Sequence, residues 1–238
     1  MNKKWRYGIA LGLALSCCLG IGAVRADEVQ IKSYIVHADS YQLPYKGSEK
    51  TFNHHINPGY GSALALKGIK ADGTLEFYAI TDRGPNGDIP GYRKNGKKMS
   101  GKFFPVPDFT PSIGVITVRP GQNRADITAS IPLKVNGRVI TGKPVPVGMT
   151  GSTKEIALSF DMKDLGTDVN GLDTEGLAVD KDGHFWISDE YGPFIVKADK
   201  NGNILEKFSP GAGLPHILAS RVPNRGSEGL TIDENGHI

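Results

Sequence analysis

An internal repeat constrains the fold of this chain more than any other feature of its sequence. Residues 174–185 align without a gap with residues 227–238, 53 positions further on, and residues 61–82 form an earlier, looser copy. Each copy has an apolar run, an Asp-Gly or Asn-Gly turn and a second apolar run. This order is typical of a β-hairpin, so the repeat predicts one hairpin in each copy.

Two further strands follow each of the first two hairpins. Residues 194–198 and 204–208 flank Asn201-Gly202, and residues 113–118 and 127–131 flank Pro120-Gly121. One repeat is therefore a four-stranded meander, the unit of a propeller blade. In this scheme residues 84–112 and 134–173 are insertions.

The predicted fold is accordingly an all-β chain, a β-propeller built from four-stranded meander blades. Propellers close with about 4–8 blades, whereas this sequence supplies two blades and a fraction of a third. The sequence ends at Ile238, inside the second strand of that third copy. We therefore expect an N-terminal fragment of a longer propeller.

The first 26 residues have the character of an export signal. Lys3, Lys4 and Arg6 precede an apolar run over residues 9–24, and Ala26 ends the segment. This pattern predicts a signal peptide over residues 1–26, a mature domain over 27–238, and an exported, periplasmic or secreted protein. A lipid anchor at Cys18 is the alternative. No later stretch is apolar enough to cross a bilayer as a helix.

The charge balance argues against nucleic acid as a partner. The formal net charge of +3 depends on four basic residues within positions 1–26, which contain no acid; the remaining 24 basic and 25 acidic residues give −1. Cys17 and Cys18 both lie in the same segment. The mature chain therefore has no internal disulfide, and its stability must come from packing or bound ions.

Acidic residues recur at equivalent strand ends of the repeat. In consecutive antiparallel strands, the residue before the first and the residue after the second lie at the same end. This geometry gathers Asp82-Arg83, Glu175, Asp189-Glu190, Arg225 and Glu228 on one face. Carboxylates that converge repel one another unless a cation or basic groups compensate them. Ca²⁺ suits such a set of oxygens, but arginines that pair with the acids or hold an anionic substrate, or a structural ring of salt bridges, fit equally well.

Four segments in order resemble the phytase-like propeller family, described by its "esterase-like activity of phytase". They are Thr81–Asn86, Asp173–Ala178, Ser188–Pro193 and Asn224–Gly229. The resemblance implies a secreted bacterial propeller similar to calcium-dependent phytases, which hydrolyse phosphomonoesters with metal-bound water. Carried over by position, it implies metal ligands at Asp82, Glu175, Asp189 and Glu228, contacts to a phosphate or ester oxygen from Arg83 and Arg225, and a general base at Glu190.

Two functions therefore stand as expectations. The first is a Ca²⁺-dependent hydrolase of small phosphomonoesters, carboxylic esters or lactones. The second is a non-catalytic propeller that binds a ligand or an envelope partner through the same acidic face, because a fold does not fix a function.

Overall fold

The structure is a computed structural model that describes residues 31–47, 50–89 and 91–238. The chain divides into two units, Met1–Ser33 and Tyr34–Ile238, and the architecture below is that of the second. The predicted signal peptide lies outside the described residues. The described residues form strands and three short 3-10 helices but no α-helix, which confirms the all-β prediction. None of their helices has the length and apolar character needed to span a membrane.

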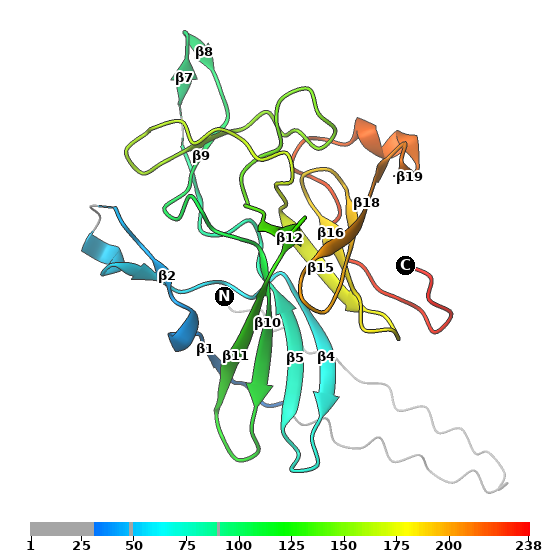
Figure 1. Ribbon diagram of the computed structural model, residues 1–238. Coiled ribbons are helices and arrows are strands. Elements are labelled where there is room, and N and C mark those ends of the chain that lie inside the picture. The colour runs from blue at the N-terminus through cyan, green and yellow to red at the C-terminus, as the bar shows by residue number, and fades with distance from the viewer. Residues whose placement is uncertain (1–30, 48–49, 90) are drawn as a thin grey trace, which may run out of the picture. The chain divides into compact units, whose positions relative to one another are not determined.

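The first meander consists of β4, β5, β10 and β11, which pair antiparallel in that order (Figure 1). Their bounds are Ala63–Ile69, Leu75–Ile80, Ser112–Val118 and Arg124–Pro132. A fifth strand that the sequence did not indicate, β1 (Ile35–His37), pairs parallel with the outer edge of β11. The first meander is therefore closed on its β11 side by the N-terminal segment.

The second meander consists of β15, β16, β17 and β18, also antiparallel in chain order. Their bounds are Thr174–Val179, Phe185–Asp189, Ile195–Ala198 and Ile204–Pro210. A short strand, β19 (Gly213–Leu214), continues the sheet in parallel with β18. Both meanders thus have the strand order expected from the repeat.

The remaining elements are short and belong to the N-terminal arm, the two insertions and the segment after β19. The pairs are β2 (Leu43–Pro44) with β3 (His55–Ile56), β7 (Arg93–Lys94) with β8 (Lys97–Lys98), and β12 (Lys134–Val135) with β13 (Arg138–Val139). A three-stranded sheet joins β6 (Gly87–Asp88), β9 (Gly101–Phe103) and β14 (Ile156–Leu158). The 3-10 helices are η1 (Asp39–Tyr41), η2 (Lys50–Phe52) and η3 (His216–Ser220).

The third copy of the repeat forms its turn but not its strands. Residues 227–238 contain no strand, so the prediction of strands there is wrong for the described structure. The turn is nevertheless closed, because Asp233 Oδ1 accepts the N–H groups of Asn235 and His237 at 2.9 and 2.8 Å. Asp180 and Asp199 close the equivalent turns of the second meander in the same way. A turn needs only local hydrogen bonds, whereas a strand needs a partner.

The main hydrophobic core lies between the two meanders. Along β5 the side chains alternate: Tyr78 and Ile80 belong to this core, and Phe77 and Ala79 to a second cluster on the opposite face. The ring of Tyr78 meets that of Phe185 edge-on, with centroids 4.9 Å apart. Strand β15 lies beside β4 and β5. This packing brings the ends of β5, β15 and β16 together.

Candidate functional site

The site is built where β5 and β16 end and β15 begins. Thr174 at the start of β15 is paired with Asp189 at the end of β16. The register shifts between Thr174 and Gly176, so Glu175 occupies a β-bulge, a feature that re-aims a side chain. The Thr174 hydroxyl donates to the carbonyl oxygen of Thr81, just after β5. One hydrogen bond therefore ties the strand ends of the two meanders together.

Three carboxylates form the centre of this site, and we call them the acid cluster: Asp173, Glu175 and Glu190. One oxygen of each lies within 4.8 Å of an oxygen of the other two. Asp173 is buried, with 1% of its surface exposed, whereas Glu175 and Glu190 are half-buried. A ligand can therefore reach the cluster at Glu175 and Glu190, whereas Asp173 is closed to solvent.

Burial and mutual repulsion disfavour the ionised forms of all three groups. Burial, followed by the charge of Asp173, raises the pKa of Glu175 to about 7. Burial is also the largest cause that raises the pKa of Asp173 and of Glu190, and Arg83 opposes both shifts. A cation would stabilise the ionised carboxylates, and perturbed groups of this kind mark functional sites.

Asp82 and Glu228 contribute charge to the cluster from its surroundings. Asp82 accepts the N–H of Gly84 at 2.7 Å, and burial raises the pKa of its carboxyl group. Glu228 is exposed, and its negative charge raises the pKa of both Glu175 and Glu190. The structure therefore brings Asp82, Glu175, Glu190 and Glu228 into one electrostatic environment.

Asp189 is engaged in the protein framework. It is fully buried, and its two carboxylate oxygens accept the N–H groups of Asp173 at 2.7 Å and Gly192 at 2.8 Å. Its carbonyl oxygen accepts the N–H of Ser227 from the third repeat copy at 3.1 Å. Asp189 therefore holds Asp173 in position, and a ligand role for it stays a prediction.

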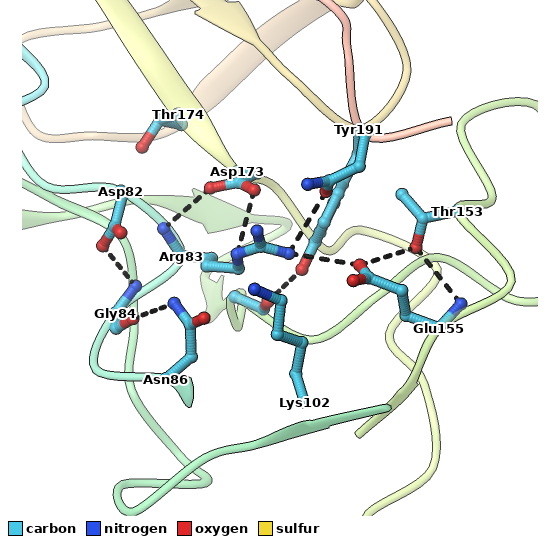
Figure 2. Close-up of polar contacts among 12 residues, drawn as sticks. Asp82, Arg83, Gly84, Asn86, Lys102, Thr153, Glu155, Asp173, Thr174 and Tyr191 are labelled. Atoms are coloured by element: carbon cyan, nitrogen blue, oxygen red, sulfur yellow. Dashed lines mark hydrogen bonds and ion pairs between the residues drawn. The ribbon is translucent and has the colours of Figure 1, made fainter. Parts of the chain in front are cut away.

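Arg83 is buried and paired with acids rather than exposed to solvent (Figure 2). Its Nε is 3.0 Å from Asp173 Oδ2 and its Nη1 is 3.2 Å from Glu155 Oε2. Its backbone N–H also donates to Asp173 Oδ1 at 3.2 Å, and its guanidinium lies over the ring of Tyr191, 5.4 Å from the centroid. Contact between Arg83 and a substrate stays a prediction; the contacts observed are those of a support for Asp173.

One buried oxygen of the cluster is compensated by an ion pair alone. Asp173 Oδ2 is buried and receives no hydrogen bond; Arg83 Nε approaches it at ion-pair distance but without hydrogen-bond angles. Buried carboxylate oxygens are usually satisfied. This oxygen, beside Glu175 and Glu190, fits the donor set that a hard divalent cation takes.

Arg225 differs from Arg83 in its surroundings. It is exposed, and it forms no hydrogen bond or ion pair with the part of the chain that the structure describes. Contact between Arg225 and a substrate stays a prediction.

Two residues of the site were missed by sequence reasoning. Asp173 directly precedes Thr174 in a segment already singled out, so the repeat contained its signal. Glu155 lies in the insertion between the meanders, 72 positions from Arg83, and no periodicity indicates it.

A second acidic group, Asp180 with Asp182 and His184, lies in the turn between β15 and β16. Asp180 already accepts the indole N–H of Trp186 at 3.0 Å, as well as the N–H groups of the turn. These hydrogen bonds close the turn of the β15–β16 hairpin, and this structural role accounts for the second acidic group.

Comparison with known proteins identifies the family. The sequence model of the phytase-like family, described as "Esterase-like activity of phytase", matches residues 63–238. The chain belongs to the phytase-like family. The matched range contains both meanders and the whole acid cluster.

One relative adds information on location only. An "Uncharacterized secreted protein" of Arthroderma benhamiae is 33% identical over 91 residues, a match that covers 27% of this chain and 18% of the relative. The chain thus spans a small part of that protein's length. No solved structure matches the chain.

Proposed function

We propose that this protein is an exported hydrolase of small phosphomonoesters or other esters, with Ca²⁺ held at the acid cluster. The family match over residues 63–238 supports a hydrolase. The secreted relative and the basic, then apolar N-terminal segment support export. The observation that carries the metal is the approach of three carboxylate oxygens within 4.8 Å.

We also propose that the two meanders are neighbouring blades of a propeller. Their order in the chain, the lateral position of β15 beside β4, and the core packed between the two sheets support this arrangement. In a propeller the first strands of the blades line the central axis. The acid cluster would then lie at the mouth of that axis.

Asp173 and Glu175 would hold the ion, with Asp82 and Glu228 close enough to influence the same charge. Calcium takes six to eight oxygen ligands with loose geometry, so carboxylates of differing burial can serve together. When bound, the ion supplies Lewis acidity that polarises an ester oxygen and acidifies water.

The chain's own residues supply orientation and proton transfer. Arg83 pairs with the carboxylate of Asp173, and Asp189 holds the backbone N–H of the same residue. Glu190 is half-buried with a raised pKa, and a carboxylate with a raised pKa is a stronger base toward water than an ordinary one. Arg225 is free to contact an anionic substrate oxygen.

The test combines calcium calorimetry with hydrolysis of p-nitrophenyl phosphate and p-nitrophenyl acetate. We expect calcium binding in wild type and loss of turnover on chelation. Glu175→Gln should weaken calcium binding about tenfold or more, since a charged ligand becomes neutral. Glu190→Gln should retain calcium and lower kcat by about 10²–10⁴-fold, the usual share of a general base.

Asp182→Asn is the matched control, because Asp182 is an exposed acid of the second acidic group, in the β15–β16 turn. It should change neither calcium binding nor turnover. Absence of calcium binding in wild type, together with unchanged turnover in Glu175→Gln, would overturn the metal proposal.

A non-catalytic binding protein is the second candidate, and the pairing of Arg83 with Asp173 and Glu155 favours it. In that case calcium would bind and stabilise the protein. Neither wild type nor Glu190→Gln would hydrolyse an ester.

A further inference from the structure

The β7–β8 hairpin concentrates positive charge in an unusual register. Arg93 pairs with Lys98 and Lys94 with Lys97, so both cross-strand pairs join two cations. Asn95 and Gly96 connect them with φ of 50° and 77°, as in the tight turns of hairpins. Like charges directly opposite each other destabilise a strand pair, and an isolated hairpin is marginal already.

The chain itself supplies little compensation. Lys94 Nζ lies 2.7 Å from Asp164 Oδ2, and Arg93 Nη1 donates to the carbonyl of Gly96 at 3.0 Å. Lys97 and Lys98 are exposed and have no ion pair among the described residues. Repulsion between the paired cations therefore destabilises this hairpin, and a negatively charged surface outside the protein would reduce that repulsion.

The loop over residues 159–165 adds apolar side chains beside these cations. The Lys94–Asp164 ion pair joins this loop to the hairpin, and the ring of Phe160 lies 5.4 Å from that of Phe103 on β9. Phe160 and Met162 are 39% and 49% exposed. We call the β7–β8 hairpin and this loop together the cationic tip.

The composition of the cationic tip is that of a membrane-surface element. It holds five basic side chains (Arg93, Lys94, Lys97, Lys98 and Lys163) and two acidic ones (Asp161 and Asp164), a net charge of +3. In Figure 1 the hairpin projects away from the strands of the first meander. The cations of the tip match the negative headgroups of an anionic membrane. The exposed apolar side chains match the apolar boundary beneath those headgroups.

We propose that the cationic tip docks this protein onto an anionic phospholipid surface. This inference does not depend on the hydrolase proposal, since it uses no residue of the acid cluster. Docking of the cationic tip would bring the acid cluster near a membrane surface.

Co-sedimentation with vesicles tests the inference. Purified full-length protein should bind vesicles of phosphatidylglycerol mixed with phosphatidylcholine, and high salt should release it. It should bind pure phosphatidylcholine vesicles much more weakly. Lys97→Gln/Lys98→Gln should lower the partition coefficient by roughly 30-fold, since each lysine near an anionic membrane contributes about fivefold.

This double variant should keep its fold, because it removes like charges that repel each other. The matched control is Lys181→Gln/Lys200→Gln, which removes two exposed lysines from the turns of the second meander. Every variant has the same N-terminus as the wild-type protein with which it is compared, so any contribution of that terminus is equal in each. The control should bind as wild type does.

Met162→Gln should weaken vesicle binding by a smaller factor, with salt dependence unchanged. Equal binding of the Lys97→Gln/Lys98→Gln variant and wild type would overturn the proposal. So would wild-type binding to both kinds of vesicle alike, or tighter binding of soluble inorganic polyphosphate than of the anionic vesicles, which would assign the tip to a free polyanion.

Discussion

Arg83 is a buried cation whose charge is balanced by two buried carboxylates. Its side chain is 7% exposed, as is that of Glu155, and that of Asp173 is 1% exposed. Arg83→Gln would leave both acids without their cation. We expect a loss of about 3–5 kcal/mol in the free energy of unfolding, the usual cost of breaking a buried pair from one side, measured by urea denaturation.

Arg225→Gln provides the comparison for this prediction, because Arg225 is exposed and unpaired within the described chain. Its effect should stay within about 0.5 kcal/mol, as for most surface positions. The two variants lose the same charge, so equal stabilities would show that the Arg83 pairs contribute nothing.

At this scale the sequence predicted where the acids gather but not what each one does. The positions of Asp82, Glu175 and Glu190 follow from strand ends, which a repeat reveals. The pairing of Arg83 with Glu155 depends on an insertion that has no repeat, and the burial of Asp189 depends on packing that spacing does not reveal. Their roles could therefore not be read from spacing alone.

The turns of the second meander allow a matched test at the scale of elements. Gly183 and Gly202 occupy the same turn position, with φ of 82° and 81°. A Cβ on Gly202 would lie 2.3 Å from the carbonyl oxygen of Pro132, whereas a Cβ on Gly183 would meet nothing within 4 Å. The turn at Gly202 also accepts the N–H of Lys134 at 2.8 Å.

We expect Gly183→Ala to cost about 1–2 kcal/mol, the usual penalty of a left-handed residue. Gly202→Ala should cost roughly 1–3 kcal/mol more, because the backbone of Pro132 must move. Thermal or urea unfolding of the two variants measures the difference. Identical losses would mean that the contact between this turn and the first meander is not held in solution.

The strands of the meanders were predicted nearly to their ends, because alternating apolar residues and Asp-Gly or Asn-Gly turns are local signals. The parallel strand β1 was not predicted, since its three residues carry no turn and pair with a segment far along the chain. The strands of the third copy were predicted but are absent, because the local pattern does not supply a partner.

At the scale of the whole molecule, the acids predict an unusual dependence of stability on pH. Unfolded Asp and Glu have pKa values of about 3.9 and 4.3, whereas those of Glu175 and Asp189 are about 7 in the folded protein. Between these values the folded state binds more protons than the unfolded state. The free energy of unfolding therefore falls as pH rises from about 4 to about 7.

Scanning calorimetry in the presence of a chelator should thus give a lower Tm at about pH 8 than at about pH 5. Calcium should reduce this difference, because it stabilises ionised carboxylates. The pKa of Asp180 is lowered to about 2. Protonation of Asp180 therefore changes the free energy of unfolding only below about pH 4, outside the range from about pH 5 to about pH 8. A Tm that rises with pH in chelator would contradict the prediction.

The pairing of β1 with β11 sets an order on the completion of the first sheet. Ile35 is paired with Arg124, so the strand that is synthesised first finds its neighbour only after a long intervening segment has emerged. Closing so long a loop is slower than closing a hairpin. Until then β11 presents an open edge, which is the kind of surface that promotes aggregation. For a chain exported as proposed above, the time between the emergence of β11 and its pairing with β1 is the interval in which a chaperone would protect this open edge.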